Sequence, residues 1–71
     1  MQYDKLGLYI KNKRLKAGKS LNGFALENGI EPAVLSRIEN LKQGIKLDAL
    51  FKIAKGFGQS PAEFLLTFET K

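Results

Sequence analysis

The side chains that most often carry out chemistry in proteins are scarce in this chain of 71 residues, which contains no histidine and no cysteine. Histidine is the commonest general base and the commonest metal ligand, and a cysteine thiolate is the usual alternative nucleophile or ligand. The sequence also lacks a glycine-rich phosphate loop and a convincing pair of carboxylates. We therefore expect no enzyme activity, no metal site and no cofactor.

The functional side chains that remain are mostly basic, and the formal net charge is +5. A positive excess raises the affinity for polyanions because binding releases their counterions. The charge is uneven along the chain: residues 1–19 carry +5, residues 20–40 carry −2, residues 41–58 carry +3 and residues 59–71 carry −1. The excess predicts either a nucleic-acid partner or simply a solvated basic surface.

Length and composition indicate a small globular protein. A chain of 71 residues, 44% hydrophobic and 27% charged, is large enough for one core, so we expect one domain over residues 1–71. Its apolar runs are too short to span a bilayer, and its first residues do not form a signal peptide. We expect a cytoplasmic protein that does not bind membranes. Residues 67–71 are expected to be a disordered tail or part of a dimer contact.

Five segments place hydrophobic residues at helical spacing, and no segment alternates with the period of a strand. The predicted helices cover residues 3–17, 21–28, 32–40, 47–57 and 61–68. Gly18 and Gly58 follow two of these helices, where glycine often closes the last turn. Ser20 is placed to cap the second helix, and Pro32 suits the first position of the third. Residues 60–63 fit a capping box for the fifth. The fold class is therefore all-α.

Spacing singles out the second and third predicted helices. Each is short, and the turn between them contains Asn28 and Gly29, a pairing typical of turns. Two short helices joined in this way are the signature of a helix-turn-helix motif, here about residues 20–40.

Leucine and phenylalanine are expected to form the core. Phe24 and Phe64 are assigned to it, rather than to a stacking platform for single strands, because they lie at helical spacing among leucines. The predicted inward face of the fourth helix comprises Leu47, Leu50, Phe51, Ala54 and Phe57.

An ordered series of residues runs through all five predicted helices. It consists of Leu6, Ile10, Arg14, Gly18, Ser20, Phe24, Ala25, Gly29, Ile30, Leu35–Asn40, Leu47, Leu50, Lys52–Lys55, Gly58, Ser60, Glu63 and Phe64. This series resembles the phage repressor/Cro-type (Xre) helix-turn-helix family over roughly residues 5–66. The resemblance implies a compact, lambda-repressor-like five-helix bundle that binds operator DNA as a transcriptional regulator, in particular a repressor. The helix at about residues 32–40 would enter the major groove.

By position in that family, the start of the third helix and the next turn would contact bases. The corresponding residues here are Glu31, Pro32, Ala33, Val34, Ser36 and Arg37. Arg37 is the strongest candidate, because a guanidinium donates two hydrogen bonds to guanine O6 and N7. Its alternative role is that of a solvated side chain. The candidate phosphate contacts are Lys19, Asn22, Asn40, Lys42 and Gln43.

The resemblance also implies a structural ion pair between Arg14 and Glu39, which would tie the recognition helix to the first helix. Three positions depart from the family pattern. Leu21 stands where a phosphate-binding glutamine is frequent, Leu41 stands where glycine is usual, and Lys13 replaces an inward leucine.

Two further partners are considered at this stage. An antitoxin-like or other protein-interaction module, with weak or no DNA binding, is the alternative function, and the acidic motif favours it. The second possible partner is another copy of the chain, because Leu65, Leu66 and Phe68 could form an apolar contact in a homodimer.

Overall fold

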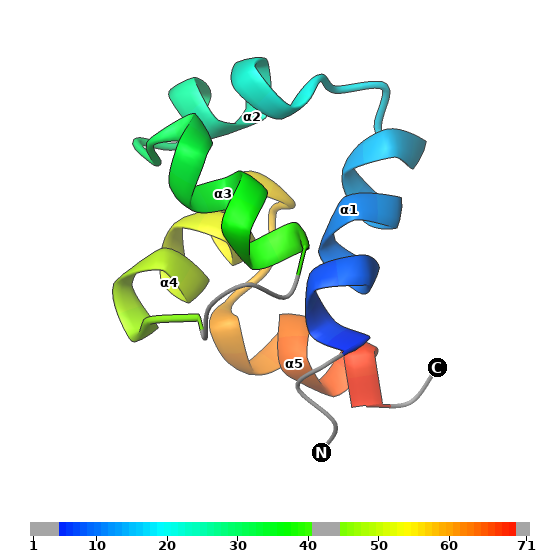
Figure 1. Ribbon diagram of the computed structural model, residues 1–71. Helices are drawn as coiled ribbons and strands as arrows, with labels where there is room; N and C mark the ends of the chain where they lie inside the picture. Colours follow the sequence, from blue (N-terminus) through cyan, green and yellow to red (C-terminus); the bar gives the residue numbers. More distant parts are fainter. Residues whose placement is uncertain (1–4, 41–44, 70–71) are drawn as a thin grey trace.

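A computed structural model describes residues 5–40 and 45–69 of the chain, and these residues form five α-helices and no strand (Figure 1). The helices are α1 (Leu6–Lys16), α2 (Leu21–Glu27), α3 (Pro32–Glu39), α4 (Leu47–Gly56) and α5 (Pro61–Glu69). The predicted all-α, five-helix fold is confirmed, and α2 to α5 begin at the predicted residues. α5 includes Thr67 and Phe68, so the first residues of the predicted tail are helical; residues 70–71 lie outside the described part.

The helix starts follow the capping residues seen in the sequence. The backbone N–H of Gly23 donates to Ser20 Oγ at 3.0 Å, which caps α2. Ser60 and Glu63 form the predicted reciprocal box: Glu63 N–H donates to Ser60 Oγ and Ser60 N–H donates to Glu63 Oε1, both at 3.1 Å. These bonds satisfy backbone N–H groups that a helix leaves unpaired at its start.

The turn between α2 and α3 depends on Gly29. Its φ of 69° lies in the left-handed region, which glycine adopts without strain. This conformation lets the Ile30 N–H donate back to the Ala25 carbonyl at 2.8 Å and closes the end of α2. Asn28 keeps a φ of −111°, so only one residue of the Asn-Gly pair takes up positive φ.

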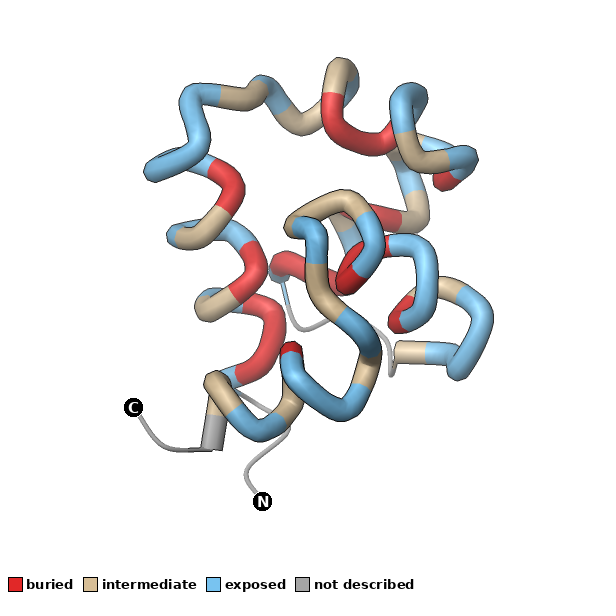
Figure 2. The backbone as a smooth tube through the Cα atoms, turned by 180° about the vertical axis from the view of Figure 1, so that it is seen from behind, coloured by how far each residue is buried: buried red, intermediate tan, exposed pale blue. Residues whose placement is uncertain are grey.

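The core is continuous and draws on all five helices (Figure 2). Its buried hydrophobic residues are Leu6, Ile10, Phe24, Ala25, Ile30, Leu35, Ile38, Leu50, Ile53, Ala54 and Phe64. The prediction that Leu47 and Phe51 belong to the core is wrong, because Leu47 is 68% exposed and Phe51 is 52% exposed. The inward face of α4 is centred on Leu50, Ile53 and Ala54, so it is rotated away from Phe51. Leu47 lies one turn before Leu50, at the exposed start of the helix.

Aromatic rings connect four of the helical segments. Phe57, just after α4, stacks on Phe24 of α2 with ring centroids 4.8 Å apart and on Phe64 of α5 at 5.9 Å. Tyr9 of α1 extends the series, with its centroid 5.5 Å from Phe64 and 5.3 Å from Phe68. Burial raises the pKa of the Tyr9 phenol. The phenylalanines at 24, 57 and 64 therefore serve the core, whereas Phe51 does not.

No helix in residues 5–40 and 45–69 combines the length and the apolar character that crossing a lipid bilayer requires.

Candidate nucleic-acid interface

α3 presents one strip of side chains to solvent. Its buried face consists of Leu35, Ile38 and Glu39. Because an α-helix repeats every 3.6 residues or about 100° per residue, the residues opposite that face lie three and four positions apart. These residues, hereafter the outer strip of α3, are Ala33, Ser36, Arg37 and Asn40. Ala33, Arg37 and Asn40 are exposed and Ser36 is half-buried at the edge of the strip.

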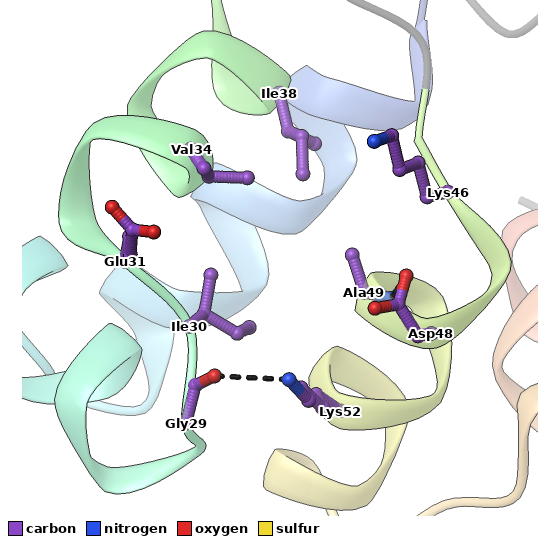
Figure 3. A pocket seen from close by; sticks show the side chains of 9 residues that line it. All are labelled: Gly29, Ile30, Glu31, Val34, Ile38, Lys46, Asp48, Ala49 and Lys52. Atoms are coloured by element: carbon purple, nitrogen blue, oxygen red, sulfur yellow. Dashed lines mark hydrogen bonds between the residues drawn. The ribbon is translucent and has the colours of Figure 1, made fainter.

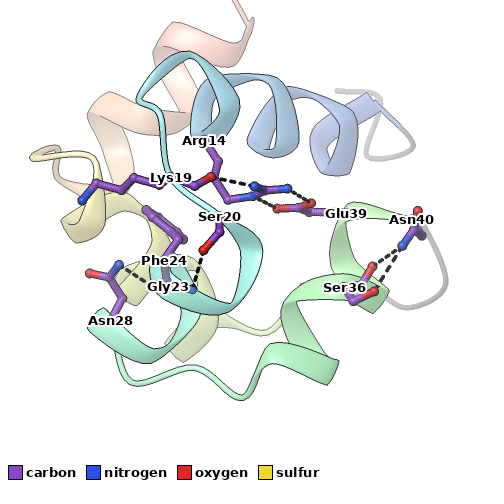
Figure 4. Close-up of polar contacts among 9 residues, drawn as sticks. All are labelled: Arg14, Lys19, Ser20, Gly23, Phe24, Asn28, Ser36, Glu39 and Asn40. Atoms are coloured by element: carbon purple, nitrogen blue, oxygen red, sulfur yellow. Dashed lines mark hydrogen bonds and ion pairs between the residues drawn. The ribbon is translucent and has the colours of Figure 1, made fainter.

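Arg37 lies in the middle of the outer strip, and no side chain in the described residues forms an ion pair with it. Its three neighbours on the strip are uncharged and Arg37 is itself exposed, so the five N–H donors of its guanidinium are accessible to a ligand. Asn40, the C-cap residue, is already engaged: its Nδ2 donates to the Ser36 carbonyl at 2.8 Å and to Ser36 Oγ at 3.3 Å (Figure 4). A phosphate would compete with Ser36 for the Asn40 amide.

The first turn of α3 offers fewer polar groups than Arg37 does. Glu31 is the N-cap residue, it is exposed, and its carboxylate makes no capping hydrogen bond. Pro32 is half-buried at the first helical position. Val34 is half-buried and packs against the core on the side that faces α4. The structure therefore brings Ala33, Ser36 and Arg37 together on one strip and sets Val34 to one side of it.

A groove of about 240 Å³ separates α3 from α4 (Figure 3). Val34 and Ile38 form its apolar wall on the α3 side, and Lys46 and Lys52 contribute from the α4 side. Lys52 Nζ donates to the Gly29 carbonyl at 3.1 Å, so this lysine also ties α4 to the turn of the motif. Two ammonium groups, together with the carboxylates of Glu31 and Asp48, thus line the groove beside α3.

A buried ion pair fixes the other side of α3. Arg14 Nε donates to Glu39 Oε2 at 2.8 Å, Arg14 Nη2 donates to Glu39 Oε1 at 2.9 Å, and the side chains are 6% and 2% exposed (Figure 4). Arg14 Nη1 also donates to the Lys19 carbonyl at 2.8 Å. The hydrogen bonds to Glu39 raise the pKa of the Arg14 guanidinium. The predicted pair is present, and it joins α1, the start of α2 and the end of α3.

The acidity of the motif is largely offset by bases that precede it. Glu39 is paired with Arg14, and Glu27 accepts a hydrogen bond from Lys19 Nζ at 3.1 Å. Glu31 is then the remaining acidic residue of the motif, and Arg37 carries the opposite charge. The outward charge near α3 is therefore less negative than the count over residues 20–40 suggests.

A sequence model described as helix-turn-helix matches residues 10–64, most of the chain. The chain belongs to this helix-turn-helix family, of the Cro/Xre type. No curated protein and no solved structure matched it. As a member of the family it is a DNA-binding regulator, with DNA as its partner, and the family is a regulatory rather than an enzymatic one.

The candidate phosphate contacts of this helix-turn-helix protein are scattered. Lys42 and Gln43 lie outside the described residues. Asn22 is exposed on the first turn of α2. The ammonium group of Lys19, bonded to Glu27, lies across the molecule from Asn40 (Figure 4). The structure thus does not bring Lys19 and Asn40 together.

Two departures from the family pattern have a physical explanation in the fold, whereas Leu41 lies outside the described residues. Lys13 Nζ lies 5.8 Å from the Tyr9 ring centroid and 5.4 Å from that of Phe57. Its aliphatic stem can cover the apolar surface while its charge is attracted to the rings, so it can replace a leucine. Leu21 is half-buried against the core and offers no hydrogen bond to a phosphate.

Lys46 and Lys52 are the basic residues that sequence reasoning did not assign to the interface. The +3 charge of residues 41–58 was the available signal. It could not distinguish lysines that border α3 from lysines on a solvated face, because that depends on how α4 packs against the motif.

Proposed function

We propose that this protein recognises specific double-stranded DNA sequences by placing α3 in the major groove, and that it acts as a transcriptional repressor. The observation that carries the proposal is the outer strip of α3, where Arg37 is exposed and has no ion-pair partner in the described residues. A bound operator would be closed to other proteins, which is the simplest route to repression.

Base readout is assigned chiefly to Arg37, through two hydrogen bonds to guanine O6 and N7. Ala33 and Val34 would contact thymine methyl groups, Ser36 would bond to a base edge or a phosphate, and Glu31 would accept from cytosine N4. Pro32 would set the position of the first turn against the groove.

Phosphate binding is assigned to the end of α3, to residues that follow it in the chain and to lysines from the α4 side of the groove. Lys46 and Lys52 border the groove between α3 and α4, and we add them to Lys42, Gln43 and Asn40. Phosphate contacts set the position of a protein on DNA without reading its sequence. Lys19 would contribute only if a phosphate displaced Glu27 from it, whereas the exposed Asn22 would bind a phosphate directly.

Selection of bound duplexes from a random pool at controlled salt tests this division of roles. Arg37→Ala should remove a guanine preference and cost about 1–3 kcal/mol on the selected site. Lys46→Ala should weaken binding to all sequences and lower the slope of log K against log salt by about one. Lys16→Ala, which removes an exposed charge at the end of α1, is the matched control and should have a smaller effect.

Three outcomes would count against the proposal. If Arg37→Ala lowered the affinity equally for all DNA sequences, Arg37 would be a phosphate contact and not a base contact. If Arg37→Ala left both the affinity and the sequence preference unchanged, Arg37 would lie outside the interface. Absence of DNA binding by the folded chain at about 50 mM salt, where phosphate contacts are strong, would favour the antitoxin-like or other protein-interaction role.

A further inference from the structure

α1 carries hydrophobic residues on two opposite faces. Leu6 and Ile10 are buried in the core, and the charged Arg14 is buried with them. Leu8 and Leu15 point the other way and are 53% and 54% exposed. The polarity of the helix is therefore partly inverted, because a charge is inside and two leucines are in water.

The two exposed leucines belong to one surface. They are seven residues apart, which places them two turns and about 10.5 Å apart along one side of the helix. Lys11 and Asn12 are exposed between them. In Figure 2 the buried segments of α1 face the body of the molecule and its exposed segments face outward. We call Leu8, Lys11, Asn12 and Leu15 the outer face of α1.

The charge of this helix has one sign. α1 contains no acidic residue, and Lys11 and Lys16 form no ion pair with any described residue. The other bases of α1 are engaged, since Arg14 binds Glu39 and Lys13 lies over aromatic rings. Lys11 is therefore an unneutralised cation between two exposed leucines.

We propose that the outer face of α1 is a docking surface for an acidic amphipathic helix of a partner protein. Leucines at a spacing of seven residues match the repeat with which two helices pack their apolar residues together. A carboxylate on the partner would pair with Lys11, while leucine or isoleucine on the partner would cover Leu8 and Leu15.

The same features disfavour two other occupants. A second copy packed symmetrically through this face would bring basic helices together, because a two-fold contact pairs a surface with itself. DNA phosphates would attract Lys11 but would leave both leucines in water. A partner that is acidic and apolar satisfies both kinds of side chain.

Docking on α1 is independent of DNA recognition by α3. Figure 1 shows α1 at one edge of the molecule, with α3 packed between it and α4. The inward side of α1 contacts α3 through Arg14 and Glu39, so the outer face points away from that contact. A helix on α1 would leave the outer strip of α3 accessible.

The test uses a synthetic helical peptide of about 18 residues, with leucine at the a and d positions and glutamate beside them. A second peptide has lysine in place of each glutamate. Titration of the full chain, followed by backbone amide chemical shifts, should show the acidic peptide perturbing residues 8–15 and not α3. Lys11→Glu should weaken its binding about tenfold or more, a change equivalent to 1.4 kcal/mol, and should improve binding of the lysine peptide.

Control variants separate docking from folding. Leu8→Ser combined with Leu15→Ser should abolish peptide binding and leave the melting temperature nearly unchanged, because both leucines are exposed. Lys55→Glu, a charge reversal at an exposed position of α4, should leave peptide binding intact. Equal binding of both peptides, or shifts confined to other helices, would overturn the proposal. So would perturbation of residues 8–15 by a random-sequence duplex, which would assign the face to nucleic acid. The effect of Arg37→Ala on DNA binding is measured separately, so it does not depend on whether the peptide binds α1.

Discussion

The buried contact between Arg14 and Glu39 connects α3 to the rest of the molecule. Removing two charges from water is costly, and three hydrogen bonds from the Arg14 guanidinium compensate for that cost here. Such a pair is weak evidence for stability, because well-packed apolar residues can replace it. Its role in this protein is to define where the end of α3 lies relative to α1.

Glu39→Gln should destabilise the protein by about 3–5 kcal/mol, because it leaves a buried guanidinium without its counter-charge. The double variant Arg14→Met, Glu39→Leu should be less destabilised than Glu39→Gln alone. Urea unfolding followed by circular dichroism measures both. If Glu39→Gln prevents folding, its comparison with the folded double variant still tests the argument.

The exposed pair of Lys19 and Glu27 provides the matched control. Its side chains are 41% and 61% exposed, so Glu27→Gln should change stability by at most about 1 kcal/mol. Equal losses at Glu39 and Glu27 would contradict the assignment of Arg14 and Glu39 as a buried pair.

At the scale of the elements, the close approach of α2 and α4 depends on a glycine. A Cβ atom on Gly56 would lie 2.7 Å from Asn28 Nδ2 and 2.8 Å from Phe24 Cζ. Asn28 is itself fixed, since its Nδ2 donates to the Phe24 carbonyl at 2.7 Å. The end of α4 can therefore reach α2 only without a side chain at residue 56.

Gly56→Ala should destabilise the protein by about 1–3 kcal/mol through overpacking. Helix propensity alone predicts the opposite sign, with a gain of up to about 1 kcal/mol. The free energy of unfolding in urea decides between them. Adding Asn28→Ala should recover only part of the loss, because the Phe24 ring remains. A Gly56→Ala variant as stable as the natural protein would refute the close contact.

At the scale of the whole molecule, size bears on how the protein occupies DNA. The Cα atoms extend over 27 × 25 × 22 Å, and half-sites one DNA turn apart are separated by about 34 Å. With side chains added, two copies on one face of DNA would be close neighbours. Leu66 on α5 is 64% exposed, whereas Leu65 and Phe68, the other predicted dimer residues, are partly buried against the core.

We propose that two copies bind a palindromic operator cooperatively, with Leu66 near the contact between them. Sedimentation of the protein with a two-half-site duplex should show two copies bound, and the second should bind more tightly than the first. Leu66→Ser should reduce this cooperativity without affecting a single half-site. Independent binding of the two copies would exclude the dimer. So would a duplex with two half-sites that still binds a single copy at high protein concentration.

The helices and the motif were predictable because their signals are local. Ser20, Pro32 and the box at residues 60–63 act within one turn of helix, and Gly29 acts within one turn of backbone. The inward face of α4 was less predictable, because Phe51 and Ile53 are both compatible with a helix buried on one side. Packing of α4 into the core decided between them, since Ile53 is fully buried and Phe51 is 52% exposed.

For the candidate site, the sequence by itself determined the residues of α3 and the pairing of Arg14 with Glu39, since both follow from position in a family with this helix order. Tertiary structure alone decided which residues stand beside α3. Lys46 and Lys52 reach it because α4 packs against the motif, and Arg14 and Lys19 offset the charges of Glu39 and Glu27. Contacts between residues distant in the chain depend on how the helices pack, and the spacing of residues within one helix does not determine that packing.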